Sequence, residues 1–90
     1  MPKAIVDPTE LRRFAQSLKK FSLALEEQTR TLHGQLAALA DTWRDQEHDR
    51  FVEDFEQTRQ VLRRFAEAAN NHVPLLLRKA EKIEEYLQQR

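Results

Sequence analysis

Apolar side chains recur every seven residues through the first half of this chain. Phe14 and Phe21 stand between leucines of one heptad series: Leu11, Leu18, Leu25, Leu32 and Leu39. A heptad spacing of this kind aligns apolar side chains along one stripe of a helix. Just before the series, Asp7 is a suitable N-cap residue and Pro8 suits the first helical position. The pattern predicts a helix over about residues 8–41.

A second apolar pattern occupies the other half of the chain, with members three, four or seven residues apart. Its principal members are Phe51, Phe55, Leu62, Phe65, Ala69, His72, Leu76 and Ile83. This spacing predicts a second helix over about residues 47–88. Pro74 interrupts the pattern after Asn70 and Asn71. Because proline lacks a backbone donor and clashes with the preceding turn, we expect a kink or a broken turn near residues 70–74.

The two predicted helices are joined by a short segment at residues 42–46, which contains Trp43, the only tryptophan. Two long helices with a short connection pack antiparallel. The sequence therefore predicts an all-α fold, in which residues 1–90 form a single two-helix antiparallel hairpin. We expect the tryptophan to pack at the closed end of this hairpin.

One hairpin does not bury all the apolar side chains of this sequence. Further apolar residues lie off the heptad stripes: Leu23, Leu36, Val61, Val73, Leu75 and Leu77. The simplest way to cover them is a second hairpin, which gives a four-helix bundle. We expect the core and the dimer interface to be formed by the stripe residues: Leu11, Phe14, Leu18, Phe21, Leu25, Leu32, Leu39, Phe51, Phe55, Leu62, Phe65, Leu76 and Ile83.

Composition agrees with a helical bundle and removes several function classes. Charged residues make up 33% of the chain, the net charge is zero, and there is one glycine and no cysteine. This balance is typical of coiled coils and gives no general attraction for nucleic acid. Without cysteine, a disulfide or a thiolate metal site is excluded. The sequence predicts neither a transmembrane span nor an ordinary secretory signal peptide.

No arrangement of residues suggests catalysis. The three histidines, His33, His48 and His72, are not paired at metal-ligand spacing. The Glu-x-x-His motifs of di-iron bundles are absent, and one glycine cannot build a phosphate-binding loop. We expect no enzyme, no metal and no cofactor, although an enzyme or metal protein is kept as a third and weaker hypothesis.

Charge is segregated along the predicted hairpin. The open half, residues 1–24 with 64–90, has ten basic and six acidic side chains. The turn half, residues 25–63, has five basic and nine acidic side chains. The halves therefore carry +4 and −4, and this asymmetry favours an antiparallel dimer in which opposite ends meet.

The central stretch "WRDQEHDRFVEDFEQ", with Phe51 eight residues after Trp43, resembles the WXG family of ESAT-like proteins. These are small helical hairpins of type VII secretion. The resemblance implies a secretion substrate, or a small partner of a larger effector, that is exported without a cleavable signal peptide. It also implies a homodimer or a heterodimer with a related chain, and contact with a secretion ATPase or an effector.

Two positions depart from the family pattern. Asp45 stands where the family has the glycine of Trp-x-Gly. Aspartate tolerates a left-handed turn conformation and also caps helices, so either role is open. At the other end, Tyr86 is followed four residues later by Arg90, where the family often has an acidic residue. The alternative reading is therefore an intracellular structural or adaptor hairpin that is not exported.

Overall fold

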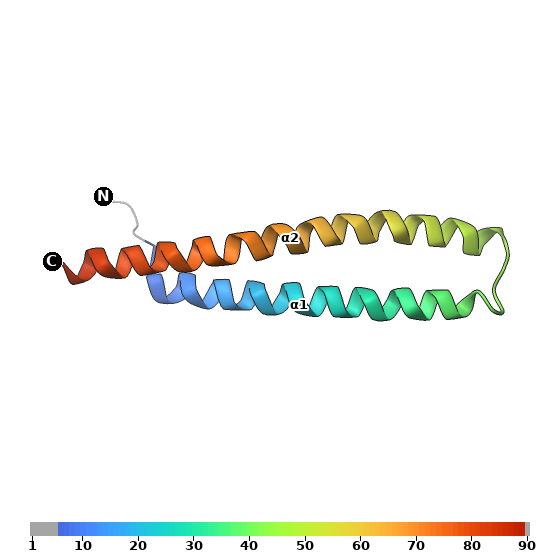
Figure 1. The fold of residues 1–90 in the computed structure, drawn as a ribbon, viewed down its shortest axis with the longest axis horizontal. Coiled ribbons are helices and arrows are strands. Elements are labelled where there is room, and N and C mark those ends of the chain that lie inside the picture. The colour runs from blue at the N-terminus through green and yellow to red at the C-terminus, as the bar shows by residue number, and fades with distance from the viewer. Residues whose placement is uncertain (1–5, 90) are drawn as a thin grey trace.

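The computed structural model describes residues 6–89, which form two antiparallel helices (Figure 1). Helix α1 spans Pro8–Leu39 and helix α2 spans Gln46–Gln88. The hairpin is a rod measuring 67 × 23 × 15 Å. The predicted all-α hairpin is confirmed. Helix α1 ends two residues before position 41, and α2 begins one residue before position 47.

Small side chains make the closest packing between the helices. Ala15 and Ser22 of α1 and Ala66 and Ala80 of α2 are all fully buried. The Ser22 hydroxyl lies 3.3 Å from the Ala66 carbonyl oxygen, within hydrogen-bond distance. Because interaxial distance depends on the side chains at the contact, this row brings the helix backbones close together. A phenylalanine does not fit in such a row and must pack at its flank.

The packing divides the predicted stripe residues into two groups. Seven are half-buried beside the small residues: Leu11, Leu18, Leu25, Phe55, Leu62, Leu76 and Ile83. Six are exposed: Phe14, Phe21, Leu32, Leu39, Phe51 and Phe65. Leu36 and Val73, which lie off the stripes, are buried between the helices. The stripes predicted from sequence therefore lie partly on the flank of the hairpin, because alanine and serine occupy its centre.

Helix α2 continues without a break through residues 70–74, and Figure 1 shows gentle curvature there in place of a sharp kink. The broken turn expected from the sequence is therefore wrong, and of the expected kink only a gentle bend remains. Pro74 lies on the exposed side of α2, whereas Ala69 and Val73 are buried against α1. Packing on the buried side holds the backbone helical, so that the missing amide of Pro74 removes a hydrogen bond without ending the helix.

An ion pair joins the two helices near their open ends. The Arg12 guanidinium donates two hydrogen bonds to the Glu84 carboxylate, each 2.7 Å long. Through this bond Arg12 holds the pKa of Glu84 below its ordinary value. A lowered carboxylate pKa stabilises the fold above the unfolded pKa, and this contribution is lost as pH falls through the folded pKa. The pair bridges α1 and α2 between positions far apart in the sequence.

Gly34 lies inside α1, and a Cβ atom added there would meet nothing within 4 Å. We expect Gly34→Ala to stabilise the protein by about 1 kcal/mol, because alanine loses less backbone entropy in a helix. Urea unfolding followed by circular dichroism measures this change. An unchanged or lower unfolding midpoint would contradict the prediction.

Candidate protein-interaction surface

One flank of the rod carries half of the exposed bulky apolar side chains of residues 6–89. This phenylalanine face consists of Phe14, Phe21, Leu32 and Leu39 of α1 and Phe51 and Phe65 of α2. Each of these side chains is between 47% and 57% exposed. The rings of Phe21 and Phe65 meet edge to face with centroids 6.1 Å apart, which places the contributions of α1 and α2 on the same flank.

The phenylalanine face extends along both halves of the hairpin. On α1 its members are seven or eleven residues apart, so they project in nearly the same direction. Single exposed apolar side chains are ordinary, but a contiguous stripe of this kind marks a protein contact. Other exposed apolar residues, such as Leu23 and Leu75, lie off this face, whereas Val61 flanks it four residues before Phe65.

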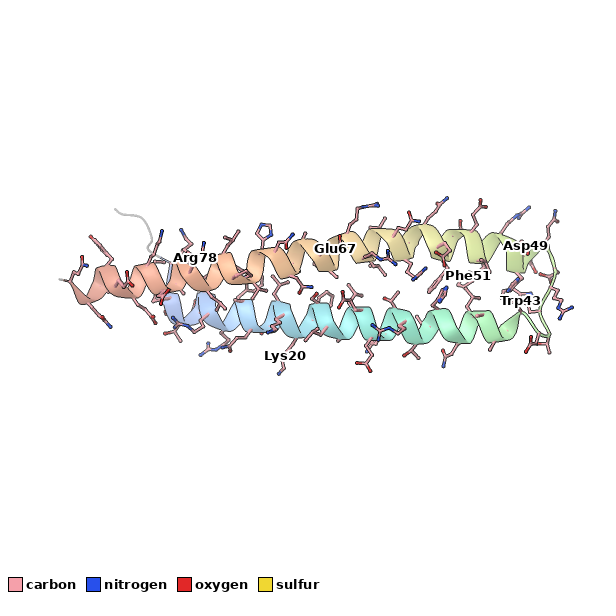
Figure 2. All side chains as sticks on the ribbon, in the orientation of Figure 1. Lys20, Trp43, Asp49, Phe51, Glu67 and Arg78 are labelled. Carbon is pink, nitrogen blue, oxygen red and sulfur yellow. The ribbon has the colours of Figure 1, made fainter. Side chains whose placement is uncertain are left out.

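Trp43 lies at the closed end of the hairpin, next to Phe51 on the adjacent part of α2 (Figure 2). The indole is half-buried, and its ring meets the His48 ring edge to face at 4.8 Å. The Trp43 amide donates to the Leu39 carbonyl at 2.8 Å, which holds the turn against the end of α1. The tryptophan therefore packs on the turn and leaves part of its ring exposed beside Phe51.

Asp45 is the N-cap of α2. Its carboxylate Oδ1 accepts a hydrogen bond from the His48 amide at 3.0 Å. Its backbone is extended, with φ −101° and ψ −174°, and no residue among 6–89 has positive φ. Of the two roles open from the sequence, the structure therefore shows the cap and not the left-handed turn.

We expect Asp45→Ala to lower the free energy of unfolding by about 1 kcal/mol, because the first turn of α2 loses its acceptor. Asp45→Gly should cost only a few tenths of a kcal/mol, since glycine is a tolerated N-cap. Chemical denaturation of the two variants beside the original protein tests both values. A loss of several kcal/mol in the glycine variant would show that Asp45 does more than cap the helix.

A polar cluster links the helices in the turn half. Glu56 accepts a hydrogen bond from Arg59 at 3.0 Å, and its other oxygen lies 3.2 Å from Nε2 of His33. Arg59, and to a smaller extent His33, lowers the pKa of Glu56. The His33 ring also stacks on Phe55. Sequence reasoning did not find this cluster, because His33 and Glu56 come together only when the helices pair in this register.

Within residues 6–89, no group of three or more histidine, aspartate and glutamate side chains is placed to hold a metal ion. Nor does either helix, in the part described, have an apolar stretch long enough for a bilayer crossing.

Comparison with known proteins agrees with this geometry. The family model WXG100, described as "Proteins of 100 residues with WXG", matches residues 4–86. Solved structures of EsxB, a secreted protein of Bacillus anthracis strain Sterne, share the fold. The wild-type EsxB structure is 24% identical with a TM-score of 0.77, covering 94% of this chain and 99% of EsxB. A selenomethionine-labelled form is 23% identical with a TM-score of 0.75, covering 96% and 98%. No curated protein sequence matches the chain.

Proposed function

Because the chain belongs to the WXG100 family, we propose that it is a non-enzymatic type VII secretion protein, either a substrate or a small partner of an effector. The phenylalanine face is the observation that carries this proposal, since it equips the hairpin to act by binding another protein. The secreted EsxB of similar fold supports export. Over residues 6–89 the helices offer a binding surface and no metal-ligand cluster.

The proposed occupant of the phenylalanine face is a second copy of this chain. Two hairpins that meet on this face bury both sets of phenylalanines and form a four-helix bundle. The Trp43 and Phe51 rings at the closed end extend the same apolar surface. A related chain with a similar face could replace the second copy, and the mass of the protein expressed alone distinguishes the two.

Charge selects an antiparallel arrangement of this proposed dimer. The turn half carries a net charge of −4 and the open half +4. In a parallel dimer like charges lie together, whereas in an antiparallel dimer each acidic turn end lies beside a basic open end. Complementarity of this kind fixes orientation more than it adds affinity. The apolar face supplies the affinity and the charges supply the direction.

Spin labels test the orientation. A label at Arg44 in one protomer should approach a label at Glu85 in the other, because these positions lie at opposite ends of the rod. The measurement is pulsed electron spin resonance on mixed, singly labelled protomers. Short distances between two labels at Arg44, one in each protomer, would show a parallel dimer and contradict the charge argument.

Export is tested in a host with an intact type VII system. The proposal requires that the protein is found in the culture medium when the secretion ATPase is active. It also requires that the protein is missing from the medium when the ATPase is inactivated. Protein confined to the cell lysate would favour the alternative of an intracellular adaptor hairpin. Tyr86 is exposed near the end of α2 and is free to form part of an export signal. Arg90, the departure from the family pattern, lies outside the described residues.

A further inference from the structure

A groove opens between α1 and α2 on the flank opposite the phenylalanine face. It has a volume of about 250 Å³, with Leu25 and Leu62 in its lining and Arg30, Arg59 and Arg63 around them. At 3.6 residues per turn, Arg30 and Arg63 lie roughly 120° or more around their helices from the phenylalanines. We call this the arginine groove. It is separate from the surface assigned to the dimer.

The groove exists because the small-residue row ends in the turn half. Near Ala15 and Ser22 the helices pack without space, but further along the seam holds Thr29, His33 and Arg59. These larger polar side chains turn toward the edge, where His33 binds Glu56. The space they leave continues past His33 into a second opening of about 300 Å³, lined largely by apolar atoms of Leu36 and Val52.

The charge of the groove is opposite to that of its surroundings. The turn half has five basic side chains and nine acidic ones, yet three of the five line this groove. One carboxylate, Glu26, shares the lining with them. Among residues 6–89, Arg30 and Arg63 form no ion pair. Arg59 binds Glu56 through Nη2 and keeps charge and donors toward the groove.

A buried donor in the groove lacks an acceptor. Arg59 Nε is buried without a hydrogen-bond partner, although its terminal nitrogen binds Glu56. Leaving a buried donor unsatisfied is costly, particularly on a charged group. A carboxylate entering the groove would meet the guanidinium groups of Arg30 and Arg63, and it would reach the buried Nε of Arg59 once that side chain turns outward. The neighbouring apolar opening would take an aliphatic side chain.

From these features we propose that the arginine groove binds an acidic amphipathic segment of another protein, with a carboxylate between the arginines and an apolar side chain near Leu36 and Val52. This inference rests on the proposed dimer: there the second copy covers the opposite flank, so the segment belongs to another protein. The hairpin then has two contact surfaces: an apolar one for its own kind and a charged one for a client.

A fluorescent helical peptide of alternating leucine and glutamate patches is the probe, with a matched peptide that has glutamine at every glutamate. Anisotropy titration with the full chain should detect binding of the acidic peptide, weakened by salt. Arg63→Gln should weaken binding about tenfold or more, the loss expected for a hydrogen bond to a charged group. Arg59→Gln should do the same, and circular dichroism checks its fold.

Arg50→Gln is the control, because it makes the same change of charge on α2 but lines neither opening. Its affinity should equal that of the original protein. The Phe21→Asp variant, altered on the opposite flank, should also bind unchanged, which separates this result from dimerisation. Equal binding of the glutamine peptide, equal loss in the Arg50 variant, or loss only in the Phe21 variant would each overturn the proposal.

Discussion

Phe21→Asp should convert the proposed dimer into a monomer. Phe21 is 54% exposed in the single hairpin and touches Phe65, near the middle of the phenylalanine face. In the dimer, aspartate would remove an aromatic contact and bury an unpaired carboxylate. Loss of a central aromatic contact costs about 2 kcal/mol or more, which is roughly a thirtyfold rise in Kd. Sedimentation over a concentration series measures this change.

Leu23→Asp is the matched control for this experiment. Leu23 is also 54% exposed and lies two residues away on α1, but it projects from a different side of the helix. Its variant should dimerise like the original protein. If both variants remain dimeric, the dimer uses another surface. If both dissociate equally, exposed apolar area in general, and not the phenylalanine face, drives association.

Ala66→Leu should destabilise the hairpin itself. Ala66 is fully buried, and its carbonyl oxygen lies 3.3 Å from the Ser22 hydroxyl. A leucine there must push α1 and α2 apart or adopt a strained rotamer. Overpacking of this kind typically costs about 1–3 kcal/mol. Urea denaturation measures this loss in the free energy of unfolding.

Ala68→Leu provides the comparison, because Ala68 is exposed on the same helix two residues away. Alanine and leucine are both good helix formers, so helix propensity changes little in either variant. Ala68→Leu should leave stability within about 0.5 kcal/mol of the original protein, as surface substitutions usually do. If instead Ala66→Leu were neutral and Ala68→Leu destabilising, a different side of α2 would face α1.

The leucine heptad shows how one pattern is divided by tertiary packing. Leu18 and Leu25 are half-buried beside α2, whereas Leu32 and Leu39 of the same series are exposed. The series repeats every seven residues, and on a straight helix the positions of such a repeat shift by about 20° around the axis per heptad. The stripe therefore crosses from the edge of the small-residue row toward the phenylalanine face. Identical residues at identical spacing thus serve different contacts.

The sequence by itself determined the helices, their antiparallel pairing, the turn at Trp43 and the family resemblance. These features depend on local signals: a heptad period, a cap at Asp7, and a short connection between long helices. It also determined the segregation of charge along the rod. None of these conclusions required knowing which side of α1 faces α2.

Only the tertiary structure decided which side of α1 faces α2. Hydrophobicity ranks phenylalanine above alanine, so the sequence alone placed Phe21 in the core or the dimer interface, without deciding between them, and gave no role to Ala66. In the folded hairpin, however, Ala66 is buried and Phe21 is exposed. Two helices of this length gain more contact by close approach along small residues than by separation around bulky rings. The same register joins His33 to Glu56 and opens the arginine groove beside them. Pairs of residues this far apart in sequence meet through the packing of the whole chain, and no local pattern encodes them.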